Sequence, residues 1–350
     1  MTKRLANYVD SYLKPFSEWL EDKTIVELAI NSDGQVWIER NGDAHMGMVE
    51  GRVIASQMSM DLAQSIVGDA GAKISKKKPL VSGKIEYKGR PLRIQVAMPP
   101  AVENGASITI RLFSKEGVPD YKAEYLYGEA VDLDDRRRTK MSKIRRIAET
   151  DLNKALKQLI EMRLNILVSG GTSTGKTTFA RHLLKSIGHN ERLITIEDAL
   201  ELFPPQKNSV NLLSERHSES PRTTDILLQS ALRMRPDRVI VGELRGREAI
   251  TYLEAINTGH GGSISTIHAE TARLAVDRLA ILVLQAGTPL TFAEVKDYIA
   301  RSIDVIVQLG RDKGKRGITE LYFPVDDLED QKGGGNFTGQ FDGGPDHGNY

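Results

Sequence analysis

The sequence predicts an α/β protein of two domains, and two observations support this prediction. The N-terminal part, to about Ser114, alternates short apolar runs with glycine-containing turns, as an α+β domain with a mainly antiparallel sheet does. From Leu164 onward, strand-like and helix-like segments alternate, which predicts a parallel sheet covered on both faces. We therefore expect an N-terminal α+β domain over residues 1–114, a linker over 115–142, an α/β domain over 143–328 and a disordered glycine-rich tail over 329–350.

The elements of the first domain follow from hydrophobic spacing. Residues 5–20 carry apolar side chains at helical intervals, which predicts one helix. Period-two alternation next to turn residues predicts antiparallel strands, at Gln35–Glu39, Lys84–Tyr87, Leu92–Met98 and Ser107–Leu112.

The expected linker lacks apolar periodicity, because Gly117, Pro119 and Gly128 interrupt it. A helix is expected after it, with an apolar face from Ile144 to Ile160.

The second domain has several short apolar segments that read as strands. They are Asn165–Ser169, Leu193–Ile196, Val239–Val241, Ser263–Ile267, Asp304–Leu309 and Ile318–Phe323. A helix is expected at Thr178–Ser186, and Thr291 with Glu294 forms a capping box that opens another.

Composition limits the classes of function. The chain has no cysteine, no apolar run long enough to cross a bilayer, and no apolar stretch of a signal peptide in Met1–Asp10. These features predict a cytosolic protein. The net charge of +1 argues against nucleic acid as a direct ligand, because proteins that hold DNA by its phosphates are usually more basic.

A complete phosphate-binding motif follows the strand expected at Asn165–Ser169 and opens a helix. The segment Gly170–Thr177 matches G-x-x-x-x-G-K-[ST]. Its glycines let backbone N–H groups turn inward toward phosphate oxygens, and the helix N-terminus adds partial positive charge. Lys176 suits the β- and γ-phosphates and Thr177 suits Mg²⁺, so ATP and Mg²⁺ are the expected cofactors. The expected nucleotide-binding residues are Gly170, Gly171, Thr172, Ser173, Thr174, Gly175, Lys176, Thr177 and Thr178.

Acidic residues follow two of the expected strands. Glu243 comes after Val239–Val241, and we expect it to position the attacking water. Glu197 comes after Leu193–Ile196, and we expect it to support the metal ion. The alternative for both acids is that they cap the helices that follow. His268 ends another strand, where it either senses the γ-phosphate or is a core histidine.

Four stretches stand in order along the chain: Gly170–Thr177, Ile196–Asp198, Arg235–Arg245 and Thr258–His268. This set resembles the secretion ATPase superfamily, in which it corresponds to the Walker A loop, the Asp box, the Walker B segment and the His box. The chain is most similar to the VirB-class traffic ATPases of type IV secretion systems, which serve conjugation or effector export.

The resemblance implies an assembly and a location. It implies a cytoplasmic homo-hexamer, peripherally associated with the inner membrane and its secretion components, with a RecA-like ATPase domain over residues 143–328. Two relatives remain as alternatives. Type II secretion ATPases carry a module of four cysteines that this chain lacks, whereas pilus retraction motors share all four boxes.

The resemblance also implies arginines at the nucleotide. Family pattern places two from the N-terminal domain there, and the matching residues are Arg93 and Arg111. Arg235, Arg238 and Arg245 flank Glu243, and we expect at least one to act across a subunit boundary. Arg235 and Arg245 are therefore candidates for catalysis, together with Lys176, Glu243, Glu197 and His268.

The segment Arg136–Arg146 leaves a second function open. It holds seven positive charges in eleven residues. They contact nucleic-acid phosphates as in a RecA-type motor, face anionic lipid, or form a solvated surface balanced by the preceding acids. A non-catalytic nucleotide-gated scaffold is a further alternative, and the presence of Lys176, Thr177 and Glu243 argues against it.

Overall fold

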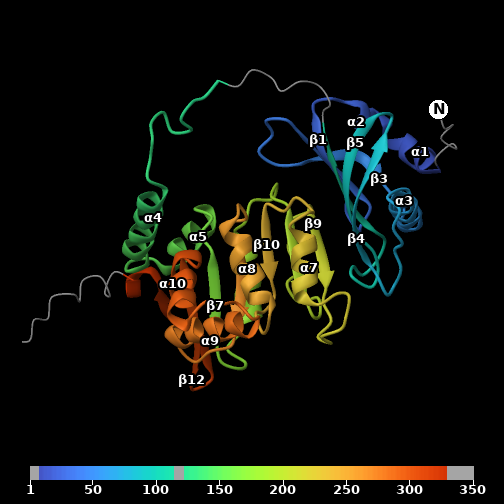
Figure 1. Ribbon diagram of the computed structural model, residues 1–350. Helices are drawn as coiled ribbons and strands as arrows, with labels where there is room; N and C mark the ends of the chain where they lie inside the picture. Colours follow the sequence, from blue (N-terminus) through green and yellow to red (C-terminus); the bar gives the residue numbers. More distant parts are fainter. Residues whose placement is uncertain (1–7, 114–121, 329–350) are drawn as a thin grey trace, which may run out of the picture.

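The computed structural model describes residues 8–113 and 122–328, and the expected tail over 329–350 lies outside them. The N-terminal domain is an antiparallel sheet of six strands in the order β3-β2-β1-β6-β5-β4. The strands are β1 (Ile25–Ile30), β2 (Gln35–Arg40), β3 (Gly47–Val53), β4 (Leu80–Tyr87), β5 (Arg90–Ala97) and β6 (Ser107–Leu112). Helix α3 (Ser56–Asp69) packs on one face, as Figure 1 shows.

The expected first helix is divided into three short elements. They are α1 (Tyr8–Leu13), the 3₁₀ turn η1 (Lys14–Phe16) and α2 (Ser17–Glu21). Pro15 lies in the first turn of η1, where its missing N–H costs nothing, but it cannot continue a longer helix.

The expected linker over residues 115–142 extends too far toward the C-terminus, because a helix begins within it. Helix α4 (Leu133–Ala148) begins ten residues before the expected boundary, because the Asp132 side chain accepts hydrogen bonds from the backbone N–H groups of Asp134 and Asp135. Only Met141 and Ile144 of α4 are buried, so its sequence carries little apolar periodicity. A second helix, α5 (Leu152–Glu161), starts at the cap Asp151, so the single helix expected from Ile144 to Ile160 is two.

The second domain contains a seven-stranded sheet in the order β13-β12-β7-β11-β10-β8-β9. Its strands are β7 (Ile166–Gly170), β8 (Leu193–Glu197), β9 (Ser209–Leu213), β10 (Arg238–Val241), β11 (Ile264–Ile267), β12 (Val305–Asp312) and β13 (Lys315–Tyr322). All pairings are parallel except that of β12 with β13, which is an antiparallel hairpin. The expected parallel sheet is confirmed apart from this edge.

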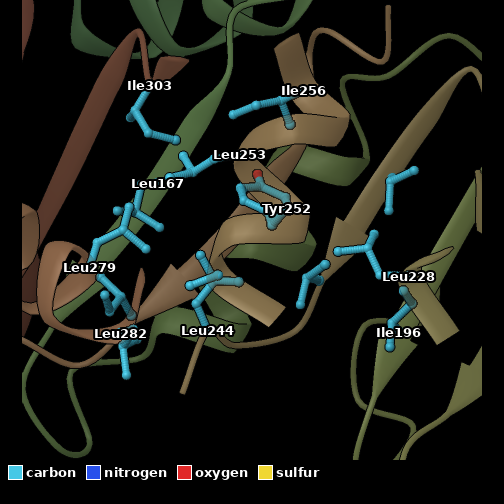
Figure 2. Close-up of a cluster of buried hydrophobic side chains, with 14 of the residues drawn as sticks. Leu167, Ile196, Leu228, Leu244, Tyr252, Leu253, Ile256, Leu279, Leu282 and Ile303 are labelled. Carbon is cyan, nitrogen blue, oxygen red and sulfur yellow. The ribbon is translucent and has the colours of Figure 1, made fainter. Parts of the chain in front are cut away.

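Helices cover both faces of this sheet, which is why its strands are buried on both sides. One face packs against α7 (Thr224–Ala231), α8 (Glu248–Asn257), α9 (Ala272–Gln285) and α10 (Phe292–Ser302). Figure 2 shows this layer, with Leu167 of the sheet and Tyr252 of α8 among its buried side chains. The other face packs against α5 and α6 (Lys176–Leu184). The expected capping box of Thr291 and Glu294 is present at α10.

The two domains pack against each other beside β9 and α7 (Figure 1). Ala97, Ala101 and Val102 of the first domain belong to the hydrophobic core of the second. The Leu213 N–H also donates to the Ala101 carbonyl at 2.8 Å. The second domain thereby covers part of the face of the N-terminal sheet that α3 leaves free. No helix among the described residues is long and apolar enough to span a membrane.

Candidate nucleotide site

The phosphate loop joins β7 to α6, and its glycines are required by its geometry. Gly175 is the N-cap of α6 and has φ +93°, which suits glycine. A Cβ atom on Gly170 would lie 2.5 Å from the Thr174 hydroxyl oxygen, and one on Gly171 would lie 2.7 Å from Glu270 Oε1. Neighbouring side chains therefore leave no room for a Cβ atom at these two glycines. The glycines allow the tight backbone turn in which successive N–H groups can face an anion.

Lys176 is buried and its ammonium group lies inside the loop. Nζ donates to the carbonyl oxygens of Gly170 at 3.0 Å and Gly171 at 3.1 Å. It also lies 3.1 Å from His268 Nδ1. Burial lowers the pKa of Lys176, and the nearby Glu243 carboxylate only partly offsets this. Its present partners are weak acceptors that phosphate oxygens can replace.

His268 connects Lys176 to Glu243. An ammonium group can only donate, so His268 Nδ1 accepts and the ring proton is on Nε2. Nε2 then faces Glu243 Oε1, 3.3 Å away. Burial lowers the pKa of His268 despite the neighbouring Glu243, so the ring is neutral at pH 7. The expectation that His268 belongs to the site agrees with this position.

Glu243 follows β10 and lies next to Glu197. A Cβ atom on Gly242 would be 3.3 Å from Glu197 Cγ, so glycine at this position lets the two acids approach. Arg245 Nη2 donates to Glu243 Oε2 at 2.5 Å. Both oxygens of the Glu243 carboxylate are thus engaged, one by His268 and one by Arg245.

The two carboxylate oxygens of Glu197 differ in their hydrogen bonding. Oε2 accepts the backbone N–H groups of Glu201 and Leu202 at 2.9 Å each, so this acid holds the loop after β8. Oε1 is buried without a hydrogen-bond partner among the described residues. Burial raises the pKa of Glu197, which favours its protonated form unless a cation is near. Glu197, Thr177 and Glu243 line one cavity of about 150 Å³.

The sequence analysis made little use of Asp198 in this cavity and missed Ser214 and Arg216. Asp198 binds the Ser214 hydroxyl at 2.8 Å and Arg216 Nε at 2.6 Å, and both partners lie on the loop after β9. Neither Arg216 nor Ser214 belongs to a recognisable motif, and β9 itself was not expected. Glu270, against Gly171, was also missed.

The other expected nucleotide-binding residues lie around the loop. Thr172, Ser173 and Thr178 are exposed, and Thr177 is half-buried in the first turn of α6. The Thr174 hydroxyl donates to the Gly171 carbonyl at 3.0 Å, so it stabilises the loop rather than facing a ligand.

Arg235 does not lie beside the phosphate loop of its own chain. Arg235 pairs with Glu39 of the N-terminal domain and with Asp237. It precedes β10 whereas Glu243 follows it, and an extended strand rises about 3.3 Å per residue, so the two residues lie at opposite edges of the sheet. Arg238 is buried against Glu191. Of the three arginines flanking Glu243, Arg245 alone reaches the site.

Arg93 and Arg111 are not brought to the phosphate loop of their own chain. Arg111 Nε pairs with Glu27 Oε1 at 2.6 Å, and Glu27 lies opposite Glu39, which binds Arg235. This places Arg111 toward the amino ends of the parallel strands, whereas the phosphate loop follows the carboxyl end of β7. Arg93 lies opposite Arg111 in the sheet, over the ring of Phe113 at 5.6 Å.

A parallel sheet with a phosphate loop after β7 and an acid after β10, with β11 between these two strands, defines a P-loop ATPase of the RecA-like class. Residues 15–321 match the family described as "Type II/IV secretion system protein". The chain belongs to this family.

Comparison with individual proteins places the chain further within it. It is 35% identical to type IV secretion system protein VirB11 of Bartonella quintana (strain Toulouse) over 332 residues, which is 89% of this chain and 91% of that protein. It is 33% identical to conjugal transfer protein TrbB of Rhizobium radiobacter over 305 residues, covering 85% and 83% of the two chains. The crystal structure of the VirB11 ATPase from the Brucella suis type IV secretion system, in complex with sulphate, superposes with a TM-score of 0.75 at 30% identity, covering 90% of this chain and 97% of that one.

Proposed function

We propose that this chain is the subunit of a ring-forming ATPase that powers a bacterial type IV secretion system, in conjugation or effector export. The observation that carries the proposal is the connected set Lys176–His268–Glu243 at the carboxyl edge of the sheet. It occurs in a chain that resembles type IV secretion system protein VirB11 over nearly its whole length. We propose that the ring is a homo-hexamer, as the resemblance of the sequence to the secretion ATPases implies.

The residues present fit Mg²⁺ bound together with ATP. The described residues hold no cluster of three acids or histidines that would bind a metal ion alone. Mg²⁺ needs few protein ligands when phosphates and water supply the rest. The unpartnered buried Oε1 of Glu197 and the Thr177 hydroxyl line the cavity beside the loop, and would hold the ion directly or through water. When bound, Mg²⁺ would neutralise charge on the phosphates.

Different residues of the site would bind the phosphates, respond to the nucleotide and activate the attacking water. Backbone N–H groups of residues 171–177 would hold the phosphates, and Lys176 would exchange its two carbonyl acceptors for β- and γ-oxygens. That movement would release His268 Nδ1, so His268 would report the presence of nucleotide to Glu243. Glu243 would orient the attacking water and take its proton.

We propose that Arg93 and Arg111 act on the nucleotide of a neighbouring subunit. Both side chains are exposed on the rim of the N-terminal sheet, toward the amino ends of the parallel strands of their own chain. In a ring this rim is available to the next subunit. Arginine suits this role because its planar guanidinium binds two phosphate oxygens at once.

The location we propose is the cytoplasmic face of the inner membrane, in contact with membrane components of the secretion system. The similarity to type IV secretion proteins supports it. Contact with anionic lipid through Arg136–Arg146 receives less support. Arg137 pairs with Asp304, Arg145 with Asp326, and Arg138 with Asp135, so much of this charge is already neutralised within the chain. The same pairs argue against a nucleic-acid motor.

Two measurements test the proposal. The purified protein should hydrolyse ATP only with Mg²⁺, and Lys176→Ala should lower turnover by about 100-fold or more, because the lysine neutralises charge on the transferred phosphoryl group. In a strain lacking the gene, wild-type protein should restore secretion or conjugative transfer and Lys176→Ala should not. Undiminished hydrolysis by the Lys176→Ala protein would refute the site, and restored transfer by it would refute the role in secretion.

A further inference from the structure

Arg245 lies between two carboxylates that come from different loops. Its Nη2 atom is 2.5 Å from Glu243 Oε2, and its Nη1 atom is 3.4 Å from Asp198 Oδ2. Glu243 follows β10 and Asp198 follows β8, and these strands are neighbours. All three residues line the cavity that also contains Thr177. The guanidinium is therefore bound closely to one acid and loosely to the other.

The close contact restrains Glu243. A carboxylate that orients water must present an oxygen to it, yet here Arg245 and His268 each engage one oxygen. A charge-assisted hydrogen bond of this length is among the stronger ones in proteins. In the arrangement described, Arg245 neutralises Glu243 and competes with the water that Glu243 should orient.

Asp198 is the alternative partner of Arg245. Its Oδ1 atom accepts from the Ser214 hydroxyl at 2.8 Å, and its Oδ2 atom accepts from Arg216 Nε at 2.6 Å. A hydroxyl and a guanidinium thus both donate to this carboxylate, as they would to an anion. Because the guanidinium is rigid, a shift of the whole group toward Asp198 that closes the 3.4 Å gap would lengthen the contact with Glu243.

Arg216 competes with Arg245 for the same oxygen. Both arginines contact Asp198 Oδ2, and Arg216 holds it at the shorter distance. The Arg216 side chain is 69% exposed on the loop after β9, so it can leave without opening the core. Its departure would give Arg245 a closer contact with Asp198.

We propose that Asp198 is a positioning residue that controls the hydrolytic step: it draws Arg245 away from Glu243, and Arg216 opposes this by occupying Asp198. Glu243 is restrained while Arg216 remains on Asp198 and is free to orient water when Arg245 takes that place. The inference rests on the ATPase function proposed above. It gives Asp198 the role of binding Arg245, not the role of a metal ligand.

The two positioning residues should have opposite effects on turnover. Asp198→Asn removes the charge that attracts Arg245, so kcat should fall by about fivefold with the KM for ATP changed less than about twofold. Arg216→Gln frees Asp198, so kcat should rise by about twofold to threefold. Damage to the fold would lower kcat in both variants. A higher kcat in Arg216→Gln therefore cannot be explained by a purely structural role of these residues.

A double-mutant cycle completes the test. Both effects should disappear in the Arg245→Gln background, because each residue acts through Arg245. Arg222→Gln is the matched control, since Arg222 is in the same loop but pairs with Glu215 and does not line the cavity. It should leave kcat unchanged in both backgrounds.

Some outcomes would overturn the inference while leaving the ATPase function intact. If wild-type protein hydrolyses ATP but Asp198→Asn and Arg216→Gln lower kcat alike, or if their effects persist without Arg245, Asp198 does not position Arg245. A wild-type protein without Mg²⁺-dependent hydrolysis would instead refute the proposed function itself. Thermal unfolding of each variant must match the wild type to exclude loss of the fold.

Discussion

Asn31 and Arg192 are hydrogen-bonded across the contact between the two domains. Arg192 Nη1 donates to Asn31 Oδ1 at 2.7 Å, and neither side chain is exposed to solvent. Burial lowers the pKa of Arg192 to about 10. Its other partners are Asn208 and the Met234 carbonyl, while Nη2 has no hydrogen-bond partner among the described residues. At these two residues the domain contact is polar and incompletely bonded, whereas Ala97, Ala101 and Val102 make an apolar part of the same contact.

Asn31→Ala should destabilise this contact. It removes one acceptor from a buried guanidinium, which costs about 1–3 kcal/mol because the charge is left without compensation. Thermal unfolding should shift to lower temperature relative to wild type. Asn41→Ala, in an exposed turn of the same domain, is the control and should have no effect. Equal shifts for the two variants would show that the Asn31–Arg192 bond contributes nothing.

Arg235→Ala should affect the domains more than the chemistry. Arg235 pairs with Glu39 across the domain contact and is largely buried, so its loss leaves Glu39 without this cation, while Asp237 keeps the backbone N–H of Arg192. We expect a lower unfolding temperature, reproduced in part by Glu39→Gln, with ATP turnover reduced far less than in Glu243→Gln. Turnover that falls as far in Arg235→Ala as in Glu243→Gln, without destabilisation, would support the catalytic role first expected for Arg235.

Much of the site could be predicted from the sequence because its motif is local. The phosphate loop, β7 and β10 are contiguous segments, and glycine spacing together with apolar runs defines them. Arg235 lies away from Glu243 of the same chain, because closeness in sequence is not closeness in space when a strand separates two residues. Strand β1 was missed because both of its faces are buried, so it shows no alternation of polar and apolar residues.

Glu197→Gln should stabilise the protein at neutral pH while it impairs hydrolysis. The folded-state pKa of Glu197 is raised by burial, so the folded protein binds its proton more tightly than the unfolded chain does. The contribution to stability is therefore greatest at low pH, and it is lost as the pH rises from about 4.5 through the folded pKa. Glutamine avoids this loss, so at pH 8 we expect a gain of about 1 kcal/mol, or about 2–4 °C.

The comparison of two pH values checks this account. Wild type and Glu197→Gln should unfold at similar temperatures near pH 4.5 and diverge at pH 8. Mg²⁺ with ATP should stabilise wild type more than the variant if Glu197 supports the metal ion. If the variant is less stable than wild type at pH 8, the carboxylate stabilises the loop after β8 by more than its burial destabilises the folded protein.

Mixing two inactive variants can decide whether Arg111 acts on a neighbouring subunit. Arg111→Ala keeps an intact RecA-like domain, whereas Glu243→Gln keeps an intact N-terminal domain. If each site combines one subunit's phosphate loop with the next subunit's Arg111, random mixing in a closed ring should restore about one quarter of the sites. Arg111 must leave Glu27 to reach phosphate, and the exposed position of its side chain allows this. ATP turnover is measured after the two proteins are dissociated and reassembled together.

The matched control is a mixture of Lys176→Ala with Glu243→Gln. Both substitutions lie in the same domain and the same half of the site, so no combination of subunits contains an intact RecA-like domain and turnover should not recover. Recovery in the first mixture alone would locate Arg111 in the neighbour's site, as its separation from its own phosphate loop leads us to expect. If neither mixture recovers, or if Arg111→Ala alone retains wild-type turnover, Arg111 does not act across the subunit boundary, and its pairing with Glu27 is then its main role.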